Sequence, residues 1–212
     1  MVTLRANDVG RKALLETVAS IVAESGVVIF PTDTVYGIGC GPASQAAVER
    51  IYSAKGRPRE KPLSLHFASV EELLEYAPGN ELAAKAARGF LPGPLTVIVA
   101  RPRSVGAFVT GGLPSVGLRV PKHGLCRAIL QASGPLAATS ANYSGASAFA
   151  GGGAVTGLPA ADVFVDDGPT PLGAESSVID VSGKRPRLVR EGAIDVATLE
   201  DVLGPFETRD ER

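Results

Sequence analysis

Residues 27–41 read VVIFPTDTVYGIGCG, an apolar run that leads into a segment rich in threonine and glycine. Residues 27–30 have the length and composition of a buried strand. Thr32, Asp33 and Thr34 follow almost directly, so small polar groups lie at the rim of the predicted sheet. Open α/β folds usually bind ligands at this rim. We therefore expect a ligand site here; the alternative is that the turn only caps the end of the strand.

A dense basic segment, KGRPREKP, follows at residues 55–62. It places four cations within seven residues: Lys55, Arg57, Arg59 and Lys61. Their alternation points the four side chains to one side of an extended backbone, and the two prolines disfavour helix. Such an array suits a triphosphate, because guanidinium groups bind phosphate through paired hydrogen bonds. The alternative is a solvated surface loop, which is the usual role of a run of charges.

Length and composition limit the classes of protein that this chain can form. It has 212 residues, of which 45% are apolar, and a formal net charge of −1. These values favour a folded chain with a substantial core and argue against a general binder of polyanions. We expect no membrane helix, which needs ~20 apolar residues, and no secretion signal. The two cysteines, Cys40 and Cys126, make no disulfide framework and fit a cytoplasmic protein.

The spacing of apolar residues predicts both helices and strands along the chain. Helices are expected at residues 11–25, 44–54, 70–76, 81–90, 125–132 and 196–203. Strands are expected at residues 27–30, 62–67, 95–100, 116–120, 136–139, 163–165, 178–181 and 187–189. The elements interleave without a regular βα period, which favours an α/β fold with a twisted open mixed sheet and helices packed on it. We expect a single domain over residues 1–205 and a frayed tail at residues 206–212.

Further polar side chains lie where predicted strands begin or end. Arg119 lies in the apolar segment SVGLRVP at residues 115–121, and an unpaired buried arginine is costly. Its anionic partner is either a carboxylate of the protein or a carboxylate of a ligand. Residues 139–145, TSANYSG, place hydroxyl and amide groups after a strand, and Ser176 and Arg190 lie at similar positions. Such groups are suited to orienting a ligand.

Several common motifs are absent from the sequence. It contains no Walker-type phosphate loop, no dinucleotide fingerprint and no nucleophile elbow. His66 and His123 are its only histidines, and without cysteines at ligand spacing they argue against a structural zinc site. His66 closes a predicted strand near the basic segment, so we expect it to make a polar contact. Cations, hydroxyl groups and a buried arginine, without a recognisable nucleophile, favour catalysis by positioning and electrostatics over covalent catalysis.

Six sequence blocks follow one another along the chain: PTDTVYGIG (31–39), KGRP (55–58), LPGPLT (91–96), GLRVP (117–121), SAN (140–142) and SSVID (176–180). Together they closely resemble the YrdC-like family, whose main members are L-threonylcarbamoyladenylate synthases. The resemblance runs from about Val27 to Gly192. It implies a reaction of L-threonine, bicarbonate and ATP that forms L-threonylcarbamoyladenylate and releases pyrophosphate. This is the first step in forming N6-threonylcarbamoyladenosine at position 37 of tRNA, and the product passes to a separate tRNA threonylcarbamoyl-transferase.

The resemblance also implies roles for individual residues. Five are implied on the threonine side: Thr34, His66, Arg119, Ser140 and Ser176. Seven are implied on the ATP side: Lys55, Arg57, Lys61, Ser115, Asn142, Ala150 and Arg190. Lys55 and Arg57 are also implied as catalytic residues, and Mg²⁺ is expected to accompany ATP without a metal site built from protein ligands. The residue-based interpretation agrees, since Arg119 would pair with the amino-acid carboxylate and the basic segment with the triphosphate.

The mechanism that follows from this resemblance has two steps. The neutral amine of threonine is carboxylated to a carbamate, whose oxygen then attacks the α-phosphorus while Mg²⁺ and the cations stabilise the leaving pyrophosphate. The resemblance also allows a weak direct contact with tRNA, and no contact with a membrane is expected. Two alternatives remain: an RNA-binding module without catalysis, against which the low aromatic content of 5% argues, and a carbamoyl-transfer enzyme similar to the YrdC-like module of hydrogenase-maturation proteins.

Overall fold

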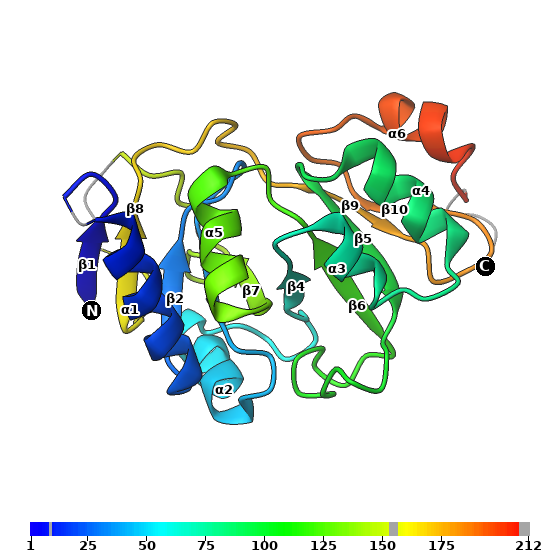
Figure 1. Ribbon diagram of the computed structural model, residues 1–212. Coiled ribbons are helices and arrows are strands. Elements are labelled where there is room, and N and C mark those ends of the chain that lie inside the picture. Colours follow the sequence, from blue (N-terminus) through cyan, green and yellow to red (C-terminus); the bar gives the residue numbers. More distant parts are fainter. Residues whose placement is uncertain (9, 153–156, 208–212) are drawn as a thin grey trace.

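The computed structural model describes residues 1–8, 10–152 and 157–207. These residues form a mixed sheet with helices on both of its faces (Figure 1). The strands are β1 (Val2–Arg5), β2 (Val27–Phe30), β3 (Gly37–Cys40), β4 (Ser64–His66), β5 (Leu95–Ala100), β6 (Ser115–Arg119), β7 (Leu136–Ser140), β8 (Val163–Asp166), β9 (Ser177–Asp180) and β10 (Arg187–Arg190). The helices are α1 (Arg11–Ala23), α2 (Gln45–Lys55), α3 (Val70–Leu74), α4 (Glu81–Phe90), α5 (Gly124–Ser133) and α6 (Val196–Leu203).

The strands of the described residues pair in the order β1-β8-β2-β3-β7-β4-β6-β5-β9-β10. β8 lies parallel to β1 and β2, and the pairs β4–β6 and β5–β9 are parallel as well. The other neighbouring pairs are antiparallel. The predicted twisted mixed sheet of the α/β class is therefore confirmed.

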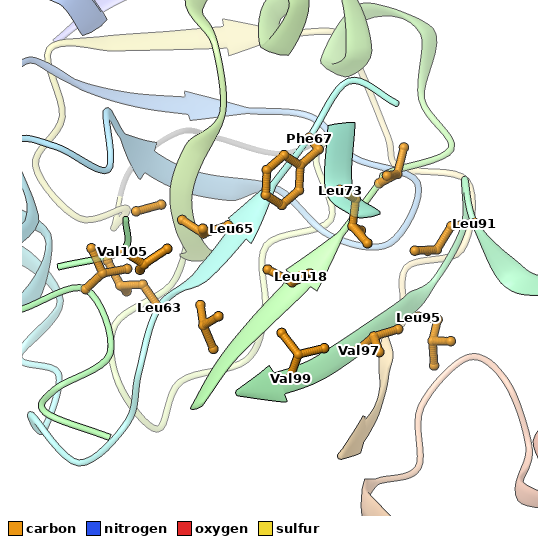
Figure 2. Packing of buried hydrophobic residues seen from close by; sticks show 14 of the residues in the cluster. Leu63, Leu65, Phe67, Leu73, Leu91, Leu95, Val97, Val99, Val105 and Leu118 are labelled. Carbon is orange, nitrogen blue, oxygen red and sulfur yellow. The ribbon is translucent and has the colours of Figure 1, made fainter. Parts of the chain in front are cut away.

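Alternate side chains of the sheet pack into two separate hydrophobic cores, one on each face, as β2 illustrates. Val28 and Phe30 pack with α1 and α5 on one face, and the strands that contribute to that cluster are β1, β8, β2 and β7. Val27 and Ile29 join the larger cluster on the other face, to which α2, α3, α4 and α6 contribute. Figure 2 shows part of this larger cluster, with side chains from β4, β6 and β5 beside Leu73 of α3. One face of the sheet is thus covered by four helices and the other only partly.

The sequence did not predict strand β3, because glycines such as Gly37 and Gly39 are typical of a turn. Instead β3 lies between β2 and β7 and pairs with both along its whole length. A side chain at either glycine would collide with its neighbours: an added Cβ would lie 2.9 Å from Phe30 Cζ at Gly37 and 3.0 Å from Ala138 Cβ at Gly39. The glycines therefore allow close packing inside the sheet, whereas the sequence pattern was typical of a loop.

The two ends of the described chain are more ordered than the sequence predicted. Strand β1, which the sequence did not predict, pairs in parallel with β8 at the edge of the sheet (Figure 1). At the other end, Phe206 packs against the larger core and the amide of Glu207 donates to the carbonyl of Pro186 at 2.9 Å. Residues 208–212 of the predicted frayed tail lie outside the described residues.

Candidate active site

A cavity of about 510 Å³ lies over the part of the sheet that α1 and α5 leave uncovered. Its floor is formed by alternate residues of neighbouring strands, such as Ser64 and His66 of β4 and Gly117 and Arg119 of β6. Since alternate residues share a face of a strand, the cavity lies on the face of the sheet. The sequence predicted a site at the rim of the sheet. The turn that follows β2 contributes one wall of the cavity.

The structure brings most of the predicted site residues to this cavity. Those that line it are Thr34, Arg57, Lys61, His66, Arg119, Ser140, Ser176 and Arg190. Four others do not line it: Lys55, Ser115, Asn142 and Ala150. All five residues assigned to the threonine side are thus present, together with three of the seven assigned to the ATP side.

The threonine-rich turn is rigid because its side chains bond to its own backbone. Thr32 donates its hydroxyl to the carbonyl of Val35 at 2.6 Å and accepts from the amide of Thr34 at 3.1 Å. The carbonyl of Thr34 in turn accepts the hydroxyl of Thr170 at 2.8 Å. The turn is buried, so these bonds hold the Thr34 side chain at the cavity wall.

Arg119 is buried on β6 and nevertheless lines the cavity. Its Nη2 donates to Asp33 Oδ1 at 2.7 Å, and its Nε donates to the carbonyl of Gly93 at 3.3 Å. Burial lowers the pKa of Arg119, and the charge of Asp33 opposes that shift. Of the two partners that the sequence left open, the internal carboxylate is therefore observed. Its presence still leaves Nη1 of Arg119 available to a ligand.

His66 is uncharged and has an unused nitrogen. Burial, together with the nearby charge of Arg119, lowers the pKa of His66 to about 3. Nδ1 of the ring is buried and has no hydrogen-bond partner among the described residues. The ring meets Phe30 edge-on, with the two centroids 6.0 Å apart. His66 can therefore offer a polar contact to a ligand without adding a charge, and the polar contact expected from its position stays a prediction.

Ser176 links two parts of the cavity wall. Its hydroxyl lies 3.0 Å from the hydroxyl of Thr96 on β5, a cavity residue that the sequence analysis did not single out. Arg190 donates to the carbonyl of Ser176 from Nη2 at 2.9 Å and to its hydroxyl at 3.3 Å. Nη1 of Arg190 also pairs with Glu175 at 2.9 Å. The threonine side and the ATP side of the predicted site therefore meet at this serine.

The basic segment does not form the single array that its alternation predicted. Lys55 is the last residue of α2, and Gly56 reverses the chain with a φ of 58°. Arg59 points away from the cavity, where it pairs with Glu49 and stacks over the ring of Tyr52 at 4.6 Å. The prediction of four cations on one side was wrong because the segment turns at Gly56 and is not extended.

Two cations of the segment do reach the cavity. Arg57 donates from Nε to the carbonyl of Lys61 and from Nη2 to the carbonyl of Pro62, both at 2.9 Å. These bonds hold the guanidinium in place, and its burial lowers the pKa of Arg57. Lys61 is exposed at the cavity edge. The cavity thus keeps one fixed and one exposed cation from this segment.

The ammonium group of Lys55 contacts the protein backbone. It donates to the carbonyls of Ser140 and Asn142, where β7 ends, and the side chain is only 2% exposed. Burial, with a smaller contribution from Arg57, lowers the pKa of Lys55 to about 8. Lys55 therefore supports the cavity wall from behind, although the resemblance implied a contact with phosphate.

The other three residues outside the cavity lie in well-defined places. Asn142 follows β7 and donates from Nδ2 to the carbonyl of Ala146 at 2.7 Å, while its Oδ1 is buried without a partner among the described residues. Ser115 begins β6, at the opposite end of that strand from Arg119. The carbonyl of Ala150 accepts the amide of Thr170 at 2.7 Å. Their assignment to the ATP side stays a prediction.

The described residues were also compared with what a metal site and a membrane helix require. Among them, no group of three or more histidine, cysteine, aspartate or glutamate side chains could hold a metal ion. Within the same part of the chain, no helix has both the length and the apolar character needed to cross a membrane.

The fold and the cavity agree with comparisons against known proteins. The family model Sua5/YciO/YrdC, described as "Telomere recombination", matches residues 20–192. The chain therefore belongs to the Sua5/YciO/YrdC family, which confirms the resemblance to YrdC-like proteins.

Individual relatives refine this comparison. The threonylcarbamoyl-AMP synthase of Bacillus subtilis is 39% identical over 199 residues, which cover 89% of this chain and 56% of that protein. A putative threonylcarbamoyl-AMP synthase of Mycobacterium leprae is 35% identical over 183 residues, covering 84% of this chain and 82% of that protein. The crystal structure of Pyrococcus abyssi Sua5 complexed with L-threonine has a TM-score of 0.85 and 34% identity, covering 96% of this chain and 60% of that chain. The chain thus spans a little over half the length of the Bacillus relative.

Proposed function

We propose that this chain synthesises L-threonylcarbamoyladenylate from L-threonine, bicarbonate and ATP and releases pyrophosphate. The observation that carries the proposal is one cavity lined both by an arginine with hydroxyl groups, suited to an amino acid, and by further cations, suited to phosphate. The names of the relatives support it, because the protein of Bacillus subtilis is called a threonylcarbamoyl-AMP synthase and that of Mycobacterium leprae a putative one. The structure of Pyrococcus abyssi Sua5 with L-threonine supports the choice of amino acid.

In the amino-acid half, Nη1 of Arg119 binds the carboxylate of threonine. Thr34, Ser140 and Ser176 surround the substrate with hydroxyl groups that can pair with its own hydroxyl. His66 stays neutral at physiological pH, so it does not repel a substrate that still carries a proton on its amine. The amine must lose that proton before it can attack the carbon of bicarbonate, where a C–N bond forms, a C–O bond breaks and water leaves to give the carbamate.

In the nucleotide half, Arg57, Lys61 and Arg190 bind the phosphates. A carbamate oxygen attacks the α-phosphorus, a new bond from oxygen to phosphorus forms, and the bond to pyrophosphate breaks. Preorganised cations stabilise the charge that develops on the leaving group without having to reorganise first. The backbone contacts of Arg57 and Arg190 provide this preorganisation.

Mg²⁺ fits this cavity as an ion that arrives with ATP. Glu60 and Glu175 are the carboxylates that line the cavity, and either can add an oxygen ligand. Mg²⁺ commonly uses one or two carboxylates together with substrate phosphates. When bound, the ion would neutralise part of the charge on the triphosphate.

The wider role follows from the product. We place this reaction at the first step of forming N6-threonylcarbamoyladenosine at position 37 of tRNA, in the cytoplasm. A separate tRNA threonylcarbamoyl-transferase would then consume the adenylate, and a weak contact of this chain with tRNA is compatible with that order.

Release of pyrophosphate tests the proposal directly. The purified chain is incubated with ATP and Mg²⁺, and threonine and bicarbonate are omitted in turn. We expect release only when both are present, together with a product that has the mass of threonylcarbamoyladenylate. Strongly salt-dependent binding of tRNA without turnover would favour the RNA-binding alternative, and turnover that requires carbamoyl phosphate would favour the carbamoyl-transfer alternative.

A further inference from the structure

Asp33 is the partner of Arg119 and lies behind it. The Arg119–Asp33 pair is almost completely buried, with side-chain exposures of 6% and 5%. Arg119 lines the cavity and Asp33 does not. The guanidinium therefore separates the carboxylate of Asp33 from the space in which a ligand would bind.

The backbone that carries Asp33 is held on both sides. Its carbonyl accepts the amide of Leu172 at 3.0 Å, and the amide of Thr34 donates to the hydroxyl of Thr32 at 3.1 Å. The carbonyl of Thr34 accepts the hydroxyl of Thr170 at 2.8 Å. The carboxylate of Asp33 is thus fixed in position relative to β6 and its arginine.

The contacts of Arg119 leave one side of the guanidinium unused. Nε donates to Gly93 at 3.3 Å and Nη2 donates to Asp33 at 2.7 Å, while Nη1 has no hydrogen bond within the described chain. Of these anchors, only Asp33 is charged and at a short distance, so it determines the plane of the guanidinium. Charge-assisted hydrogen bonds of this kind are roughly twice as strong as neutral ones.

Stability alone is a poor explanation for this pair. A buried ion pair often contributes no more than apolar residues of similar volume would. In addition, Oδ2 of Asp33 is buried and has no partner within the described part of the chain. An unsatisfied buried oxygen in a native protein calls for a specific reason. Here the reason can be the orientation of the guanidinium.

We propose that Asp33 is a positioning residue of the amino-acid half, which holds Arg119 so that Nη1 faces the carboxylate of the substrate. The inference rests on the proposed function, because it takes threonine as the ligand of Arg119. Asp33 itself does not touch the substrate in this arrangement. Its loss should therefore impair the use of threonine and leave the binding of ATP unchanged.

Two substitutions of different severity test the inference. In Asp33→Asn the side chain keeps an oxygen that can accept from Nη2, whereas Asp33→Ala removes the anchor completely. We expect kcat/KM for threonine to fall about 10-fold in D33N and about 100-fold in D33A, since misplacement of a reacting group can cost about this much. The KM for ATP should stay within about twofold, and all rates are referred to the folded fraction measured by circular dichroism.

Asp162→Asn is the matched control. Asp162 also pairs with an arginine, Arg50, at 2.8 Å, but neither residue lines the cavity. D162N should leave the kcat/KM of folded enzyme for threonine unchanged. Equal threonine parameters in wild type and D33N, or tighter binding of threonine by D33N, would overturn the inference, and D33N keeps the test valid if D33A does not fold. A wild-type chain without threonine-dependent turnover would instead refute the proposed function.

Discussion

Lys55 offers the clearest test of how the cavity wall is supported. Its ammonium group joins the end of α2 to the carbonyls of Ser140, the last residue of β7, and Asn142, which comes just after that strand. The carbonyl of Lys55 also accepts the amide of Ser144 at 2.9 Å. The resemblance to relatives implied that Lys55 faces phosphate, so the structure and the sequence analysis give different expectations for the same side chain.

The informative substitution is Lys55→Met, which keeps most of the unbranched stem and removes every donor. A buried carbonyl that loses its partner costs about 1–3 kcal/mol, and two carbonyls are affected here. Part of this loss is offset because the mutant no longer buries an ammonium group, whose burial lowers its pKa to about 8. We therefore expect the free energy of unfolding to fall by roughly 1–3 kcal/mol in K55M.

The kinetic effect should involve both substrates. Ser140 is assigned to the threonine side and Asn142 to the ATP side, and the same ammonium group holds both. If this segment shifts, KM should rise for threonine and for ATP, and kcat should fall by up to about 100-fold. Urea denaturation gives the stability, and pyrophosphate release with each substrate varied in turn gives the kinetic parameters.

Lys61→Met serves as the control, since Lys61 lies exposed at the edge of the same cavity. A surface substitution of this kind usually changes stability by no more than about 0.5 kcal/mol, so K61M should affect only the KM for ATP. A K55M enzyme that is as stable as wild type and loses only its affinity for ATP would refute a supporting role of Lys55. Lys55 would then act on phosphate in the bound enzyme, as the resemblance implied.

The structure supports three further predictions. Burial lowers the pKa of Lys55 from 10.5 to about 8, so between these two pH values the unfolded chain binds more protons than the folded chain. The stability of wild type should therefore rise relative to that of K55M between pH 7 and pH 9, as measured by urea denaturation. Arg57→Ala should lower the rate of pyrophosphate release about 10²–10³-fold in a protein that still melts cooperatively, because it removes a fixed cation from the leaving group; a near-normal rate would remove Arg57 from the site. Calorimetry should show threonine binding more tightly than valine by about 1–3 kcal/mol, since valine leaves the hydroxyl groups of the cavity unpaired, and more tightly than serine by about 1 kcal/mol or more; equal affinities would contradict the assignment of the amino-acid half.

Much of the fold could be predicted because its strands are short apolar runs between turn residues. The run at residues 27–30 predicted β2 with the bounds that the structure shows. Strand β3 could not be predicted in the same way, because two of its four residues are glycines. Glycine is typical of turns when only local sequence is considered. Its purpose in β3 depends on Phe30 and Ala138, which lie on the two neighbouring strands.

In the candidate site, polar contacts could not be predicted either, because their partners lie far apart in the sequence. The sequence indicated that Arg119 needs an anionic partner, but that partner lies 86 residues away in the chain. Lys55 and the carbonyl of Ser140 are separated by 85 residues. Composition and spacing can identify residues with unusual chemistry, whereas these pairings exist only once the sheet has brought β7, β4 and β6 together.

These long-range pairings also change how the cations of the site are understood. The sequence suggested an extended basic segment with four cations on one side that bind a triphosphate. In the structure, Arg57 and Arg190 already donate to backbone carbonyls, and Arg119 already pairs with Asp33. Groups held in this way lose little conformational entropy when a substrate arrives, and they need little reorganisation as charge develops. Such a site depends on the residues behind the cavity wall as much as on those that line it, which is why Lys55 and Asp33 are the positions to test.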